Sequence, residues 1–200
     1  MTSIDHITLE VADPSAAERF YIEALGLDAH VRLRASEAPT TGFRGFTLSL
    51  VVSQPSAVNA LMDAALAAGG TTLKPAAKSL WGYGGGVQGP DGTVVTFASS
   101  SKKDTGPATR QIDDVVLQLG VADVAASKRF YVERGLPVGK SFGSKYVEFA
   151  LPARTVKLAL LKRRALAKAA GVAPDGEGSH RLAIGGDAGP VTDPDGFTWE

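Results

Sequence analysis

The feature that most constrains the fold of this chain is an internal repeat. Residues 4–27 (IDHITLEVADPSAAERFYIEALGL) resemble residues 112–136 (IDDVVLQLGVADVAASKRFYVERGL). A second phrase, Pro-Asp-Gly followed by an apolar segment, occurs at 90–92 and again at 194–196. Self-similarity of this kind indicates duplication of a supersecondary unit. Each copy is therefore predicted to open with a strand and a helix and to close with a turn and a strand.

Local signals within the repeat agree with this prediction. Alternation of apolar and polar residues predicts a half-buried first strand, one face of which carries Ile4, His6, Thr8 and Glu10. Asp13 and Asp123 stand where a helix N-cap belongs. Gly26 and Gly135 follow the helices as C-terminal stops. The Pro-Asp-Gly phrase has the residues of a tight turn.

Further helices and strands are predicted outside the repeated segments. A helix is predicted over 55–70 and a weaker one over 163–172. Strands are expected near 27–34, 46–53, 71–74, 85–88, 93–98, 137–142, 145–151, 155–162, 180–185 and 197–200. Short strands with few helices, arranged in two similar halves, favour an α+β fold. The expected organisation is a first unit at 1–99, a polar linker at 100–110 and a second, shortened unit at 111–200.

Composition excludes several classes of function. The chain has 200 residues, 44% of them hydrophobic, with 21 basic and 21 acidic side chains. This balance gives no reason to expect a nucleic-acid or membrane partner. The absence of cysteine excludes thiolate chemistry and fits a cytoplasmic location. The N-terminus shows no signal-peptide pattern, and no apolar run is long enough for a membrane span.

The sequence resembles the vicinal oxygen chelate superfamily, which includes glyoxalase I, bleomycin-resistance proteins and extradiol dioxygenases. The resemblance lies in the opening repeat, in GGVQGPDGTVVTF and in DPDGFTWE. It implies tandem glyoxalase/bleomycin-resistance-like βαβββ modules that curl into small-molecule-binding cups. It says little about activity, because the superfamily contains isomerases, transferases, dioxygenases and binding proteins.

The resemblance also implies where metal ligands would lie. The family takes them from the opening strands of both modules and from the closing strands, with a Glu ending the second module. In the first copy these positions hold His6, Phe46 or Thr47, and Thr96. In the second copy they hold Asp114, His180 and Glu200. Neither copy has a complete set of histidines and carboxylates.

The two copies are shortened in complementary places. The first module of copy one lacks room for a hairpin, and the second module of copy two lacks room for a helix. If the modules pair crosswise, 46–99 and 111–162 form a full cup, while 1–36 and 178–200 form a smaller one. The smaller cup would then collect His6, His180 and Glu200, the composition of a facial triad. If each copy closes its own cup, His6 lies apart from the other two.

Candidate ligand-binding residues are chosen mainly from the aromatic and glycine-rich stretch 78–92. Trp81 and Tyr83 suit stacking against a planar ligand, although Trp81 could instead cover the core. Further candidates are Phe46, Gln88, Asp114, Tyr146 and Glu148, with Gln118 as a weaker one. Strand parity decides which of them point inward.

Three functions remain open at this stage. The first is binding of a small planar or aromatic compound, without a cofactor in the main cup. The second is a lyase, isomerase or dioxygenase of glyoxalase type that uses Fe, Zn, Ni or Mn at His6, His180 and Glu200. The third is a non-catalytic role with vestigial cups. Whether the chain is an enzyme is left open, and it is expected to be a monomeric pseudo-dimer or a homodimer.

Overall fold

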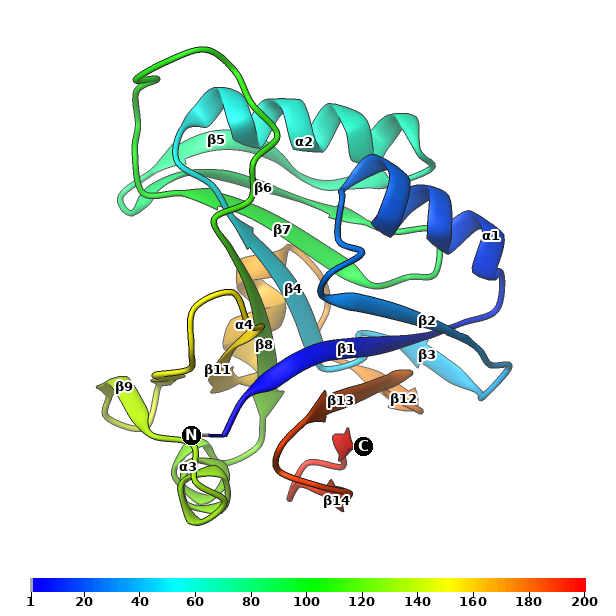
Figure 1. Cartoon of the computed structure of the whole chain (residues 1–200), viewed down its shortest axis with the longest axis vertical. Helices are drawn as coiled ribbons and strands as arrows, with labels where there is room; N and C mark the ends of the chain where they lie inside the picture. Colours follow the sequence, from blue (N-terminus) through cyan, green and yellow to red (C-terminus); the bar gives the residue numbers. More distant parts are fainter. Residues whose placement is uncertain (1) are drawn as a thin grey trace.

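The computed structural model describes residues 2–200, which form two mixed sheets and a short two-stranded ribbon (Figure 1). The larger sheet has the strand order β5-β6-β7-β4-β8-β11-β10-β9. Its strands are β4 (Phe46–Val51), β5 (Thr71–Ser79), β6 (Gly82–Gln88), β7 (Val94–Ser99), β8 (Asp114–Val121), β9 (Val138–Phe142), β10 (Tyr146–Phe149) and β11 (Lys157–Lys162). The central pair, β4 with β8, is antiparallel and joins the two copies.

The smaller sheet has the order β14-β15-β13-β1-β2 and also draws on both copies. It consists of β1 (Ile4–Val11), β2 (Val31–Ala35), β13 (Leu182–Gly186), β14 (Val191–Thr192) and β15 (Thr198–Trp199). The ribbon pairs β3 (Thr40–Gly42) with β12 (Gly176–Gly178). Of the two arrangements that the sequence left open, the structure therefore has the crosswise one, and the copies are not self-contained.

The helices begin and end where the local signals predict. They are α1 (Pro14–Ala17), which continues into η1 (Glu18–Ala24), α2 (Pro55–Ala67), α3 (Val124–Glu133) and α4 (Arg163–Ala170). Asp13 and Asp123 accept backbone N–H bonds as N-caps. Gly26 and Gly135 adopt positive φ angles of 66° and 86° after the helices. No helix within residues 2–200 is long and apolar enough to cross a membrane.

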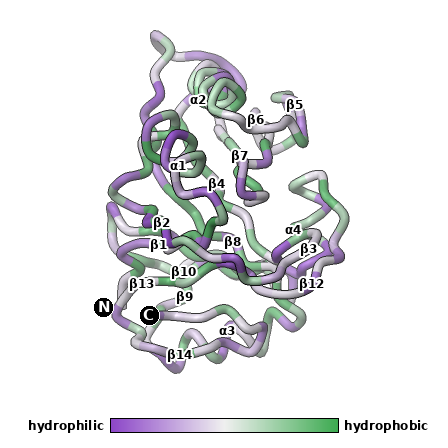
Figure 2. The backbone as a smooth tube through the Cα atoms, turned by 90° about the vertical axis from the view of Figure 1, so that its right-hand side faces the viewer, coloured by the Kyte–Doolittle hydropathy of each residue, from purple (hydrophilic) through white to green (hydrophobic). Residues whose placement is uncertain are grey.

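Figure 2 shows α2 beside β5, β6 and β7 at one end of the molecule, and α3 with β14 at the other. Buried apolar side chains from both sheets and the helices α1–α3 form one contiguous core between these ends. The predicted face of β1 needs one correction. The strand register shifts between Ile4 and His6, so Ile4 is fully buried while His6 is partly exposed.

The linker between the copies follows a fixed path because a buried glutamine binds it. The Gln54 side-chain oxygen accepts hydrogen bonds from the backbone N–H groups of Thr105 and Gly106. Its amide nitrogen donates to the carbonyls of Gly106 and Pro107. All hydrogen-bonding groups of the Gln54 amide are thus used by the linker, which leads the chain from β7 into β8.

Two buried tyrosines connect the sheets. Tyr21 in η1 donates a 2.5 Å hydrogen bond to Asp91, which lies before β7. Tyr131 in α3 donates a 2.6 Å hydrogen bond to Asp193, which lies before β15. Burial raises the pKa of both hydroxyls well above the ordinary tyrosine range, so they remain donors. We call these two contacts the tyrosine clamps. Each joins the opening helix of a copy to the closing turn of the same copy, across the two sheets.

We expect Tyr131→Phe to lower the free energy of unfolding by about 1.5–3 kcal/mol, because the variant removes a buried hydrogen bond to a carboxylate. Urea denaturation at pH 7 measures the change. Tyr146→Phe is the matched control. The Tyr146 hydroxyl binds Glu148 in an outer hairpin, so its removal should lower the free energy of unfolding by less. Equal midpoints for Tyr131→Phe and the wild type would contradict a stabilising role for this clamp.

Candidate functional site

The concave face of the larger sheet carries a polar floor. Strand register places Ser49 beside Thr96 on one side and Val116 on the other. One step along the sheet, the hydroxyl of Thr47 donates a 2.9 Å hydrogen bond to the side-chain oxygen of Gln118. Because residues two apart on a strand share a face, these side chains all point to the same side. The floor therefore presents hydroxyl and amide groups.

Helix α4 covers part of this face. A Cβ atom on Gly120 of β8 would lie 3.0 Å from the Arg163 Cα, so the start of the helix rests directly on the strand. Buried side chains on α4 pack with Phe43 and Val94. At the other end of the helix, the Lys74 ammonium on β5 donates a 3.2 Å hydrogen bond to the Ala169 carbonyl. The helix thus crosses the cup from β8 to β5.

A cavity of about 530 Å³ remains between α4 and the strands β4 to β7. Its polar lining residues are Thr47, Ser49, Lys74, Lys78, Ser79, Thr96 and Gln118. Leu166, Ala169 and Ala170 of α4 form an apolar wall, and the backbone of Gly84–Gly86 lines the opposite strand. Trp81 lies in the β5–β6 turn at the mouth and is 84% exposed. No His, Asp or Glu is among the residues that line this cavity.

The structure places only some of the predicted ligand-binding residues here. Trp81 and Gln118 line the cavity. Phe46 is the neighbour of Thr47 on β4, so its side chain points to the opposite face of the sheet. There it is buried in the main core. The hydroxyl of Tyr83 donates to Asn59 of α2, on the convex side of the sheet. Phe46 and Tyr83 therefore do not face the cavity.

The other candidates lie elsewhere on the sheet. Gln88 lines a separate hollow of about 250 Å³, where its amide donates to the Gly92 carbonyl. Asp114 lines a hollow of about 400 Å³ at the seam between the copies. Tyr146 donates a 2.9 Å hydrogen bond to Glu148 on β10, and burial raises the pKa of the Tyr146 hydroxyl. None of these four residues lines the cup cavity.

The metal positions of the larger sheet do not fit a metal ion. In the smaller sheet the backbone of Glu200 bonds to Ile184, which places Glu200 beside Gly185, and Gly185 pairs with His6. The matching row of the larger sheet is Thr96, Ser49 and Val116. The position equivalent to His6 is thus Val116 and not Asp114. The equivalence has to be counted back from Val-Ala-Asp, because copy two has two extra residues between its Ile-Asp and its Val-Ala-Asp. The hydroxyls of Thr96 and Ser49 and the apolar side chain of Val116 are a poor ligand set for a metal ion.

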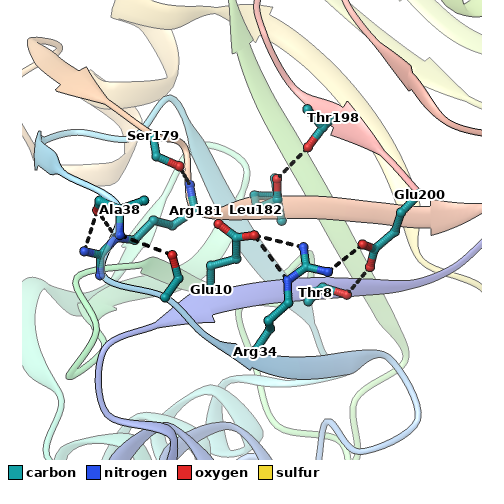
Figure 3. Close-up of polar contacts among 10 residues, drawn as sticks. Thr8, Glu10, Arg34, Ala38, Ser179, Arg181, Leu182, Thr198 and Glu200 are labelled. Carbon is teal, nitrogen blue, oxygen red and sulfur yellow. Dashed lines mark hydrogen bonds and ion pairs between the residues drawn. The ribbon is translucent and has the colours of Figure 1, made fainter.

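The smaller sheet uses Glu200 for an ion-pair network instead (Figure 3). One oxygen of Glu200 accepts a 2.6 Å hydrogen bond from Thr8, and the other a 2.7 Å bond from Arg34. Arg34 also binds Glu10 at 2.9 Å. The bonds from Thr8 and Arg34 lower the pKa of the Glu200 carboxyl. The carboxylate predicted as a metal ligand is therefore already coordinated by protein donors.

The predicted triad of His6, His180 and Glu200 is not assembled. His180 precedes β13, and its two ring nitrogens lie 2.5 Å from the Arg44 carbonyl and 3.1 Å from the Asp195 carbonyl. The strand position beside His6 belongs to Gly185, whose missing Cβ makes room for the His6 ring. Within residues 2–200 no group of three His, Asp or Glu side chains is arranged to hold a metal ion.

Sequence reasoning missed Ser49, Lys74 and Lys78 and the wall formed by α4. The signal for Ser49 was its spacing, since it lies two residues beyond Thr47 on the same strand. The lysines are exposed residues of an edge strand, and nothing in their local sequence indicates that they border a cavity.

Comparison with known proteins identifies the fold. No family model matches the sequence, and no curated protein matches it. Glyoxalase I from Zea mays is similar in structure, with a TM-score of 0.60 and 16% identity over 100% of this chain and 91% of the other. Its V278E mutant gives 0.61 and 17% over the same shares. A putative dioxygenase from Bacillus subtilis gives 0.57 and 12%, over 92% and 69%.

These likenesses show that the chain has the vicinal oxygen chelate fold, built from tandem βαβββ modules, some of them shortened. The fold class inferred from the repeat is thereby confirmed. Activity does not follow from the fold, since one fold hosts many chemistries.

We expect the pKa of His6 to lie below its ordinary value of 6.5, because burial and the nearby Arg32 guanidinium disfavour the charged ring. NMR titration of the imidazole measures it. Since the folded state lowers this pKa, the histidine's contribution to stability is present above about pH 6.5 and is lost as the pH falls.

Charge variants test the cause of this shift. Arg32→Gln should raise the His6 pKa, and Glu200→Gln should lower it further, because Glu200 favours the charged ring. Arg129→Gln on the exposed side of α3 is the control and should leave it unchanged. An unaltered His6 pKa in both test variants would show that these two charges do not act on the ring.

Proposed function

We propose that this protein binds a small organic molecule in the cavity between α4 and the larger sheet. The observation that carries this proposal is the cavity itself, which combines a volume of about 530 Å³ with a few convergent polar groups and an apolar wall. Ligand sites in proteins are typically concave pockets of about 300–1,000 Å³ with this mixed lining. The fold supports the proposal, because the cavity occupies the concave face of a complete module pair.

The ligand does not require a metal ion in this proposal. The side chains in the row Thr96, Ser49 and Val116 offer no carboxylate or imidazole. In the smaller sheet, Thr8 and Arg34 use both oxygens of Glu200. Binding is therefore attributed to the floor hydroxyls and amide, Lys74 and the apolar wall.

Two alanines of α4 provide a matched test of the site. Both are exposed, but Ala169 lines the cavity and Ala165, one turn earlier on the same helix, does not. We expect Ala169→Trp to fill the cavity and weaken binding by at least about tenfold, corresponding to ~1.4 kcal/mol. Ala165→Trp should leave binding unchanged. Thermal unfolding of both variants checks that the fold is kept.

The ligand search uses saturation-transfer NMR with a library of small neutral, cationic and anionic ring compounds. Trp81 emission provides a second readout, with Trp81→Phe to separate it from the buried Trp199. The proposal requires compounds that bind the wild type and the Ala165→Trp variant but not Ala169→Trp. Absence of any binder, or equal binding by the two tryptophan variants, would overturn it.

We further expect ligand affinity to survive chelation. Protein dialysed against EDTA should bind the same library compounds with unchanged affinity, because protein groups alone form the site. Isothermal titration before and after dialysis measures this. A loss of affinity that added Zn²⁺ or Fe²⁺ restores would instead favour a metal-dependent activity of glyoxalase type.

A further inference from the structure

The charge of the cavity lining is uneven. Lys74 and Lys78 both belong to it, and no carboxylate does. Neither lysine takes part in an ion pair with another residue of the 2–200 range. The hydrogen bond from Lys74 goes to a neutral carbonyl, that of Ala169, so its charge is not cancelled. Lys78 pairs with Tyr83 and so points to the α2 side of the sheet, which leaves Lys74 as the cation on the cavity side. A cationic ligand in the cavity would meet this like charge.

The hydrogen-bond donors follow a single row across the sheet. Lys74 pairs with Gly86, Gly86 with Thr96, and Thr96 with Ser49. Gly86 has no side chain, and a Cβ placed there would still lie 3.5 Å from the nearest atom, a methyl carbon of Thr96. The open space over Gly86 therefore lies in this row between the positions of Lys74 and Thr96. Groups that donate hydrogen bonds around such a space suit an oxyanion.

The rest of the cavity suits a flat apolar body. Gly85 faces α2, since a Cβ on it would strike the Met62 sulfur, so the neighbouring Gly84 and Gly86 face the cavity. These two glycines make β6 a strip of bare backbone opposite the apolar wall of α4. The exposed ring of Trp81, in the β5–β6 turn, also borders the cavity.

We propose that the cavity selects a small planar organic carboxylate, whose charged end lies at Lys74, Thr96 and Ser49 and whose ring lies along Gly84 and Gly86. This inference rests on the proposed ligand site and names the chemical class that the site takes.

Three naphthalene compounds of one shape test the selection. They are 2-naphthoate, neutral 2-naphthamide and cationic 2-(aminomethyl)naphthalene, compared by isothermal titration at low salt. We expect naphthoate to bind at least about tenfold more tightly than the other two, as a charge-assisted hydrogen bond allows. Raising the salt concentration should weaken naphthoate binding and leave naphthamide binding unchanged.

Lysine variants separate charge from structure. Lys74→Gln should reduce the preference for naphthoate over naphthamide by about tenfold. Lys78→Gln, on the α2 side of the sheet, should change this preference little. Naphthamide affinity serves as the internal check that α4 has not moved in Lys74→Gln. Lys168→Gln is the control, because this exposed lysine of α4 lies outside the cavity.

The outcomes distinguish this inference from the proposed function. Equal binding of naphthoate and naphthamide, or an unchanged preference in Lys74→Gln, overturns the charge selection and leaves the site intact. Failure of all three compounds to bind also overturns the inference, while the Ala169 and Ala165 variants decide the site independently. If a ligand binds Ala169→Trp as tightly as it binds the wild type, both the proposed site and this inference are wrong.

Discussion

The antiparallel pairing of β4 with β8 is the interaction on which the rest of the structure depends. It runs from Phe46 opposite Leu119 to Val51 opposite Asp114 and lies at the centre of the eight-stranded sheet. This pairing places the second module of one copy beside the first module of the other. It creates the concave floor, because Thr47 and Gln118 meet only across it. It also leaves β1 to pair with β13 in the smaller sheet.

Much of the fold could be predicted from the sequence, because its signals are local and repeated. Asp13 and Asp123 cap their helices, and Gly26 and Gly135 end them, as their residue types require. The ribbon of β3 and β12 was not predicted, since strands of three residues have no period to detect. The bulge after Ile4 depends on the pairing with β13, so it could not be predicted from the sequence of β1 alone.

The site was less predictable, because it depends on register across several strands. A two-residue difference in length moved the position equivalent to His6 from Asp114 to Val116. His180 matched a strand position but lies before the strand, where backbone carbonyls bind its ring. The role of Lys74 depends on α4 crossing the cup, which is a tertiary contact. In the smaller sheet, Arg34 takes up the carboxylate that the motif had assigned to a metal.

The tyrosine clamps and the crosswise sheets have a consequence for the chain as a whole. A cut between residues 100 and 110 would yield two fragments, each holding part of both sheets and one clamp. Alone, each fragment would expose the edge of β4 or β8 and the edge of β1 or β13. Each fragment would need the other to pair these edges, and the linker held by Gln54 keeps the two on one chain at high effective concentration.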